Sequence, residues 1–285
     1  MDIRTLNSAD GMAIRYRRWL PAGRVRSALV IVHGIADHSG RYATFATALV
    51  EAGHAAYAVD LRGHGLTAEA TGVGETGPPG IDGVINDVAQ LVELARSESS
   101  GTPVFVFGHS IGAVIVQAFV QRHHPQIGGM ILCGSPGSSD SVRRIFEGFR
   151  GSTTRQYRAR SSERYDWLSR DVESVRAYAA DPFCGDNIAM SYRYVVGLVA
   201  LTMRVMRDDA VAGMPATAPI LLLSGEEDLA SSNAANVRRL HAHLTATGQQ
   251  VTARYYPQAR HDLLHEVVAE QVQADILSWI GDHLA

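Results

Sequence analysis

Between Pro103 and Phe119 the sequence reads PVFVFGHSIGAVIVQAF, and this stretch decides the fold. A short apolar run, typical of a buried strand, meets Gly108-His109-Ser110-Ile111-Gly112, and a run of helical length follows. A serine between two glycines at a strand-to-helix turn is the pattern that presents a strained, exposed nucleophile. The glycines keep side chains away from the closely passing chain. Ser110 is therefore the predicted catalytic nucleophile.

Apolar runs and helical patterns alternate on both sides of this stretch. A hairpin turning at Asp10-Gly11 opens the chain. Buried strands are predicted at 27–34, 54–60, 104–108, 128–134 and 219–225, and helices at 41–53, 81–99, 111–123 and 265–284. This alternation predicts an α/β class with a mostly parallel, doubly wound sheet.

The alternation of strands and helices is interrupted between the strands predicted at 128–134 and 219–225. About eighty residues without a strong strand signal separate them, which is too long for a plain connection. The sequence therefore predicts a core of residues 1–135 and 214–285 with a helical cap inserted at 136–213. The cap is rich in arginines and in apolar residues that could contact an apolar ligand, namely Phe146, Phe149, Tyr178, Phe183, Tyr192, Tyr194, Val195, Leu198, Leu201 and Met206. The arginines Arg143, Arg144, Arg150, Arg155, Arg158 and Arg160 are interpreted as a solvated face or as an attraction for an anionic group or surface.

A nucleophilic serine needs a histidine base and a carboxylate that orients it. In this architecture the order along the chain is Ser, Asp or Glu, His. The stretch PILLLSGEED predicts Asp228 as the acid, with Glu226 and Glu227 as competitors. His261 is the predicted base because it follows the last strand and its turn, and His265 is its competitor.

An oxyanion hole needs two backbone donors. The residue after the nucleophile supplies one, which is the Ile111 N–H. The loop after the strand at 27–34 supplies the other, and His33-Gly34-Ile35 points to the Ile35 N–H.

Composition narrows the remaining classes of function. The net charge of −3 gives no basic footprint, so no nucleic-acid partner is expected. All 26 basic residues are arginine, which excludes Schiff-base chemistry and a P-loop lysine. Two cysteines, Cys133 and Cys184, cannot form a disulfide framework. No signal peptide or membrane-spanning run is seen, so a cytoplasmic protein is expected.

Two further patterns are rejected as sites. GVGETG at 72–77 fits the dinucleotide pattern, but it follows no strand and two prolines stand where a helix would open. His261 and His265 have the spacing of zinc ligands, but position 262 is Asp and no third ligand is apparent. No cofactor and no metal are predicted.

Through these residues, the chain resembles the α/β-hydrolase fold enzymes of the monoacylglycerol lipase and lysophospholipase type, which are close to the serine aminopeptidase-like hydrolases. The resemblance rests on VHGIADHSGRYATFATAL, AVDLRGHGLT, GHSIGA, DPFCGDNIA and RHDLLHE. Thr67 and Ala113 depart from residues that are usual in the family. The resemblance is weakest in the cap.

The residues themselves support acyl transfer through Ser110. The resemblance implies hydrolysis of a mono-acyl ester such as a monoacylglycerol or lysophospholipid, with the cap shaping an acyl tunnel. Membrane contact is left open, because an apolar cap tip could touch a lipid surface without any spanning helix. The same triad would also serve a short-chain carboxylesterase, thioesterase, lactonase, amidase or carbon–carbon bond hydrolase. A non-catalytic ligand-binding protein of this fold is the alternative from another class. Oligomeric state is left open.

Overall fold

The computed structural model describes residues 1–99, 101–137, 164–214 and 218–284. Eight strands form one sheet in the order β1-β2-β4-β3-β5-β6-β7-β8. Their bounds are β1 Asp2–Asn7, β2 Ala13–Trp19, β3 Ser27–Val32, β4 His54–Val59, β5 Val104–His109, β6 Gly129–Cys133, β7 Ile220–Gly225 and β8 Val251–Tyr256. The pairings from β4 through β8 are parallel, and β2 runs antiparallel to β1 and β4. The predicted α/β class and mostly parallel sheet are confirmed.

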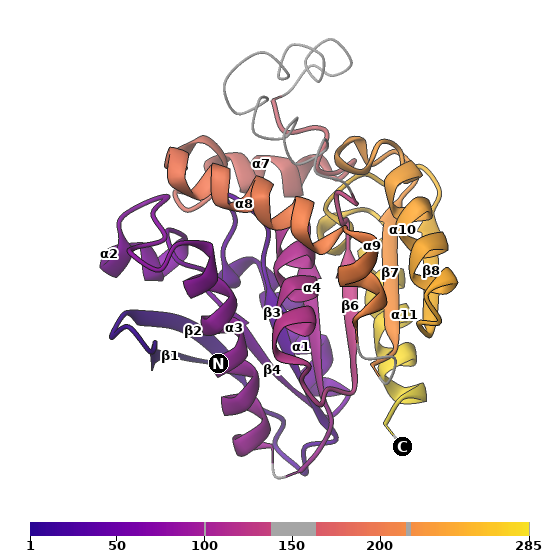
Figure 1. The fold of residues 1–285 in the computed structure, drawn as a ribbon, viewed down its shortest axis with the longest axis horizontal. Coiled ribbons are helices and arrows are strands. Elements are labelled where there is room, and N and C mark those ends of the chain that lie inside the picture. Colours follow the sequence, from indigo (N-terminus) through magenta and orange to yellow (C-terminus); the bar gives the residue numbers. More distant parts are fainter. Residues whose placement is uncertain (100, 138–163, 215–217, 285) are drawn as a thin grey trace.

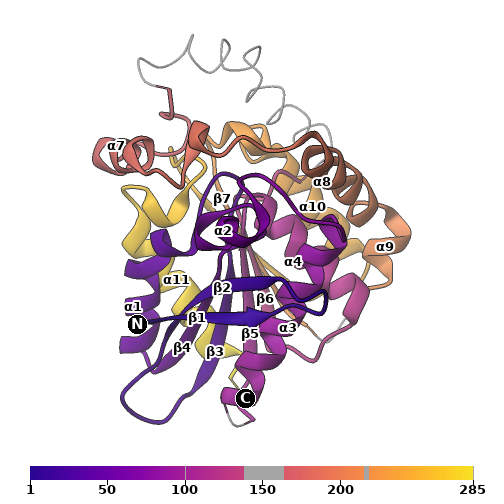
Figure 2. The ribbon, with the colours of Figure 1, turned by 90° about the vertical axis from the view of Figure 1, so that its left-hand side faces the viewer.

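Helices cover both faces of the sheet (Figures 1 and 2). The helices α1 (Ala43–Glu51) and α11 (Ala269–Asp282) pack on one face. On the other face lie α3 (Ile81–Glu98), α4 (Ile111–His123) and α10 (Ala235–Ala246). The strands β3 to β7 are buried along their whole length, because both faces are covered, whereas β1 lies at an exposed edge. This explains why the central strands read as unbroken apolar runs.

The opening hairpin is confirmed. Strands β1 and β2 pair from Asp2 with Arg18 to Asn7 with Ala13. Gly11 sits in their turn with a φ of 82°, a conformation that glycine adopts without strain.

The described part of the predicted cap, residues 164–214, is called the cap segment below. It contains α7 (Val172–Ala180), α8 (Tyr192–Val205) and the short α9 (Asp208–Ala212). Figure 1 shows α7 and α8 above the end of the sheet to which the parallel strands point. The hydrogen bonds that tie the segment to that edge include those from Tyr178 Oη to Ala36 O and from Asp262 N to Leu168 O. The boundaries of the cap at 136 and 213 stay a prediction. Phe146, Phe149 and the six cap arginines singled out above lie outside the described residues.

The glycine pattern at 72–77 forms a loop after the short helix α2 (Ala68–Thr71). This loop packs against the cap segment, since Ser191 N donates to Gly74 O. A Cβ on Gly74 would lie 2.0 Å from Ala189 O, so the glycine is required for close packing.

Candidate active site

Ser110 sits at the junction of β5 and α4 and has the backbone of a strained turn. Its φ is +54° and its ψ is −120°, outside the regions that side-chain-bearing residues prefer. The Ser110 N–H donates to Cys133 O at 2.9 Å, which ties the turn to the end of β6. The predicted strand–turn–helix context of the G-x-S-x-G pattern is therefore present.

The two glycines of the pattern are needed for space. A Cβ on Gly108 would lie 2.5 Å from Gly112 O, and one on Gly112 would lie 2.2 Å from Val32 O. Both contacts are with backbone atoms, which cannot rotate away as a side-chain end could. The turn can form only where both positions lack a side chain.

Asp228 and His261 form a buried hydrogen-bonded pair. His261 Nδ1 donates to Asp228 Oδ1 across 3.0 Å, and the two residues are 2% and 0% exposed. Asp228 follows β7, and its Oδ1 also accepts from Ala230 N at 2.8 Å, which fixes the carboxylate. The bond leaves His261 Nε2 as the nitrogen that can accept a proton.

Ser110 and His261 both lie beside the end of β6. Ser110 is held by Cys133 O, and a Cβ on the next residue, Gly134, would lie 3.3 Å from His261 Cε1. The His109 ring, one residue before the serine, lies 4.9 Å from the His261 ring. No hydrogen bond joins Ser110 Oγ to His261 in this structure, and such contacts commonly tighten only when substrate binds.

The predicted oxyanion donors flank Ser110. Ile111 is the first residue of α4, so its N–H belongs to the helix start, where backbone donors lack helical partners. Ile35 follows Gly34, whose added Cβ would lie 3.2 Å from Ser110 Cβ. No described residue accepts a hydrogen bond from either N–H.

The protonation of His261 is controlled by two opposing effects. Burial by itself would lower the pKa of the imidazole, but the Asp228 carboxylate outweighs it and raises the pKa of His261 above the usual 6.5. A base must be neutral to accept a proton, so activity should fall as the pH drops through this raised pKa.

We therefore expect the acid limb of kcat/KM, measured against pH on a short-chain ester, to lie above pH 6.5. In Asp228→Asn the carboxylate charge is gone and burial remains, so the residual activity should have its acid limb at lower pH. A limb below 6.5 in the unmodified protein, or one that Asp228→Asn leaves in place, would contradict this assignment.

The competing residues from the sequence lie elsewhere. Glu226 pairs with Arg238 at 2.5 Å, and Glu227 is exposed. His265 is hydrogen-bonded through Nδ1 to Asp262 and through Nε2 to the Arg41 carbonyl, each at 2.9 Å. Asp228 is thus the acid of the three that contacts His261.

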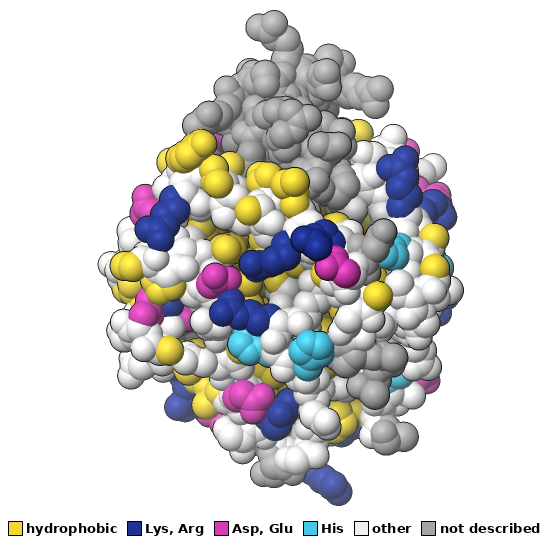
Figure 3. All heavy atoms as spheres, in the orientation of Figure 1, with side chains coloured by type: hydrophobic (Ala, Val, Ile, Leu, Met, Phe, Trp, Pro, Cys, Tyr) yellow, Lys and Arg dark blue, Asp and Glu magenta, His cyan; other side chains and the backbone are white. Residues whose placement is uncertain are grey.

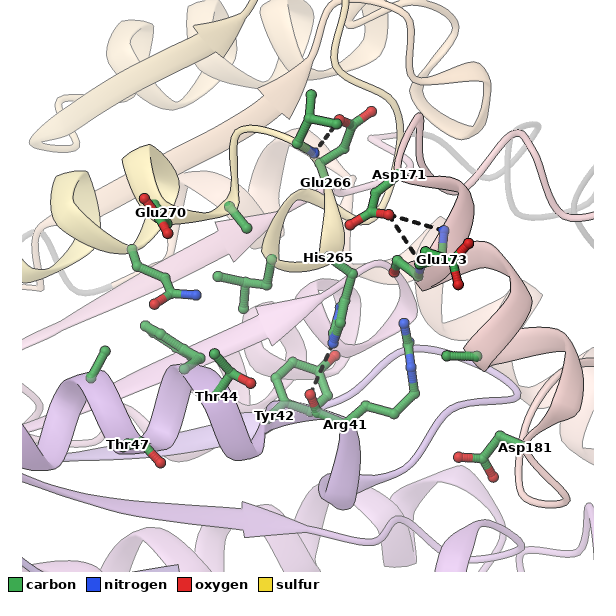
Figure 4. Close-up of a pocket in the computed structure, with 18 of the residues that line it drawn as sticks. Arg41, Tyr42, Thr44, Thr47, Asp171, Glu173, Asp181, His265, Glu266 and Glu270 are labelled. Carbon is green, nitrogen blue, oxygen red and sulfur yellow. Dashed lines mark hydrogen bonds between the residues drawn. The ribbon is translucent and has the colours of Figure 1, made fainter.

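Arg41 and His265 belong to a network of polar and charged side chains that also includes Asp262 and Asp37. Arg41 bonds Asp262 at 2.7 Å and Asp37 at 3.2 Å. Although burial would raise the pKa of Asp37, the Arg41 charge brings it down to about 2, so this carboxyl stays ionised. Arg41 and His265 line a pocket of about 990 Å³ between α1 and α7. Figure 4 shows both side chains on its wall. The lining of this pocket includes none of the predicted triad.

One group of possible metal ligands occurs among the described residues: His38, Asp181 and Cys184, whose ligand atoms lie within 4.8 Å of one another. His38 Nδ1 accepts from Gly40 N, so Nε2 carries the proton and donates to Asp181 at 2.9 Å. The nitrogen that faces the other two residues therefore offers no lone pair, and the group is explained as a hydrogen-bonded contact between the core and the cap segment.

Trp167 contacts His261, and the sequence alone did not indicate this contact. Its ring lies 5.1 Å from the His261 ring, tilted by 34°, and comes from the cap segment. Nothing in the surrounding letters distinguishes this tryptophan from one that packs inside the cap.

The sheet, the elbow and the covering cap segment define a hydrolase of the α/β-hydrolase fold. The chain belongs to the family described as serine aminopeptidase, S33, whose model matches residues 23–267. The predicted resemblance to the serine aminopeptidase-like hydrolases is confirmed, and relatives identify the chain as an ester hydrolase.

Three relatives show how far the similarity extends. The chain is 31% identical to a monoacylglycerol lipase of Mycolicibacterium smegmatis, over 96% of this chain and 95% of the relative. It is 27% identical to human monoglyceride lipase, over 100% and 92% of the two chains. Among solved structures, a thermostable carboxyl esterase from Bacillus coagulans in complex with glycerol matches with a TM-score of 0.88 and 25% identity, covering 100% and 99%.

Proposed function

We propose that this protein hydrolyses mono-acyl glycerol esters, with Ser110 as nucleophile, His261 as base and Asp228 as the residue that orients the base. The observation that carries the proposal is the buried Asp228–His261 pair beside a strained serine. It occurs in a chain that aligns along almost its full length with a monoacylglycerol lipase.

The proposed reaction has two steps. His261 Nε2 takes the proton of Ser110 as the oxygen attacks the ester carbonyl, and the Ile35 and Ile111 N–H groups bind the resulting oxyanion. Collapse expels glycerol, which receives the proton from His261. Water then attacks the acyl-serine with His261 again as base, and the fatty acid leaves.

Acyl-chain length tests the substrate class. We expect Ser110-dependent hydrolysis of p-nitrophenyl esters to peak at medium or long chains, and monoacylglycerols to be cleaved as well. A peak at acetate or butyrate without cleavage of monoacylglycerols would make the protein a short-chain carboxylesterase. Absence of Ser110-dependent turnover on every ester would contradict the proposal.

The outer face of α8 supports contact with the lipid that supplies such substrates. Tyr192, Val196 and Met203 are 74%, 45% and 59% exposed, and with the partly buried Val199 they follow helical spacing. The opposite face, with Leu198 and Leu201, is buried. Figure 3 shows hydrophobic side chains gathered over α8. None of the helices in the described part of the chain has, by itself, the length and hydropathy of a transmembrane helix. We propose that this stripe rests on a lipid surface.

A surface variant tests this contact. Val196→Ser combined with Met203→Ser should lower binding to phosphatidylcholine vesicles about tenfold, because two apolar side chains no longer enter the lipid. Turnover of a short-chain ester in free solution should stay unchanged. Leu20→Ser, at a 47% exposed position beyond β2 at the opposite edge of the sheet, is the control. Equal vesicle binding by the double variant and the control would refute the contact.

A further inference from the structure

Two buried histidines that the proposed reaction does not use lie in adjacent loops. His33 follows β3 and His64 lies in the loop after β4, and these strands are parallel neighbours. Both side chains are 0% exposed, and their rings meet edge-on at 5.1 Å. The loop after β3 also carries Ile35.

The two histidines join the loops through reciprocal hydrogen bonds, and this pair, His33 and His64 with their four hydrogen bonds, is called the clasp below. His33 Nε2 accepts from Leu61 N at 3.0 Å, and its Nδ1 donates to Gly34 O at 2.7 Å. His64 Nε2 accepts from Ala36 N at 3.1 Å, and its Nδ1 donates to Arg62 O at 2.9 Å. Each ring accepts from the opposite loop and donates within its own loop.

This pattern requires both rings to be neutral. A proton on either Nε2 would face a backbone N–H and break the contact. Burial lowers the pKa of His33, and burial together with the neighbouring His33 lowers the pKa of His64 to about 3. The clasp therefore keeps its hydrogen bonds throughout the pH range in which His261 titrates.

The bonds act on the peptide units that flank Ile35. Gly34 O and Ile35 N belong to one planar trans peptide, so fixing the carbonyl in one direction points the N–H in the opposite direction. The next peptide, Ile35 to Ala36, is fixed through Ala36 N. Ala36 has a φ of +52°, and its carbonyl accepts from Tyr178 Oη and Gly185 N.

We propose that His33 and His64 are positioning residues that aim the Ile35 N–H at the developing oxyanion, an inference that rests on the proposed function. His33 acts through the Gly34 carbonyl, and the hydrogen bond it donates also polarises the peptide and strengthens Ile35 as a donor. His64 acts through the N–H of Ala36. Neither side chain touches the substrate.

Conservative variants separate this role from packing. When asparagine replaces histidine, its side-chain amide group lies near the position of the ring Nδ1. The amide group of glutamine, which has one more methylene, lies near the position of Nε2. His33→Asn keeps the donor to Gly34 O, whereas His33→Gln loses it. At His64 the order reverses, because His64→Gln keeps the acceptor for Ala36 N and His64→Asn loses it. We expect His33→Gln and His64→Asn to lose about 10- to 100-fold in kcat, with KM changed by less than about threefold.

The matched variants, His33→Asn and His64→Gln, should retain most of kcat. His54→Asn is the control for placing an amide at a buried histidine, since His54 bonds Ser27 at the far end of β4. It should lower the melting temperature without lowering kcat. The inference predicts that Asn retains more kcat than Gln at position 33 and that Gln retains more than Asn at position 64. Losses of kcat that instead follow the losses of melting temperature would overturn it.

A measurement on the unmodified protein needs no variant to fold. The ¹⁵N shifts of both imidazoles should report neutral rings protonated at Nδ1 from pH 7 to 9, and protonation at Nε2 of either ring would overturn the clasp. Ser110→Ala is assayed in the same series. If the ester hydrolysis does not depend on Ser110, the proposed function fails. If it does and the Asn and Gln variants behave alike, only the positioning role fails.

Discussion

Ser110→Ala should reduce ester hydrolysis by about 10⁵-fold or more, which is the scale of loss when the nucleophile of such a triad is removed. Alanine cannot form the acyl intermediate, so only binding and the oxyanion donors would remain. The fold should survive, because the Ser110 backbone N–H, which bonds Cys133 O, is kept. Initial rates on a medium-chain p-nitrophenyl ester, with melting temperature alongside, measure both.

Ser27→Ala is the matched control for Ser110→Ala. Ser27 is buried like Ser110, and its Oγ lies 2.7 Å from His54 Nδ1, but at the other end of the sheet. Its loss should cost stability and leave kcat unchanged. Activity of Ser110→Ala within tenfold of the unmodified protein would remove the serine from the mechanism.

Asp228→Asn should lower kcat by about 10⁴-fold, the loss seen when the orienting carboxylate of a triad becomes an amide. Asp228 Oδ1 holds His261 Nδ1–H at 3.0 Å. If the new amide keeps its carbonyl toward the Ala230 N–H and the ring of His261, the negative charge that stabilises the imidazolium is lost. If the amide instead turns its NH₂ toward the ring, it favours the wrong tautomer of His261. Single-turnover rates at pH 8 measure the effect on chemistry.

Glu226→Gln is the control for this substitution. Glu226 follows the same strand but pairs with Arg238 at the surface, so its neutralisation should leave kcat within about twofold. If Glu226→Gln or Glu227→Gln caused the larger loss and Asp228→Asn the smaller, the acid would have to be reassigned.

Much of this arrangement could be predicted because it depends on short-range constraints. The G-x-S-x-G turn is a local steric problem, and its answer, glycine at 108 and 112, can be read directly from the sequence. The positions of Asp228 and His261 follow from the order of strands, because the carboxyl ends of parallel strands lie at one edge of the sheet. Their mutual contact is therefore expected once the strands are located.

The remaining features depend on contacts between distant segments. Trp167 reaches His261 from the cap segment, and no local pattern specifies which way that segment turns. The clasp of His33 and His64 requires knowing that β3 and β4 are neighbours and that each ring faces the opposite loop. From its position after the last strand, His265 competes with His261 as the predicted base. Its bonds to Asp262 and Arg41 separate it from Asp228.

The most direct test of the account is to treat the protein with a fluorophosphonate, locate the adduct by mass spectrometry, and assay the same sample on a monoacylglycerol. We predict one adduct per chain, on Ser110, and loss of monoacylglycerol hydrolysis in proportion to labelling. Ser110→Ala should remain unlabelled. An adduct on another residue, or hydrolysis of monoacylglycerol that persists after complete labelling of Ser110, would contradict the claim that this serine carries the acyl group.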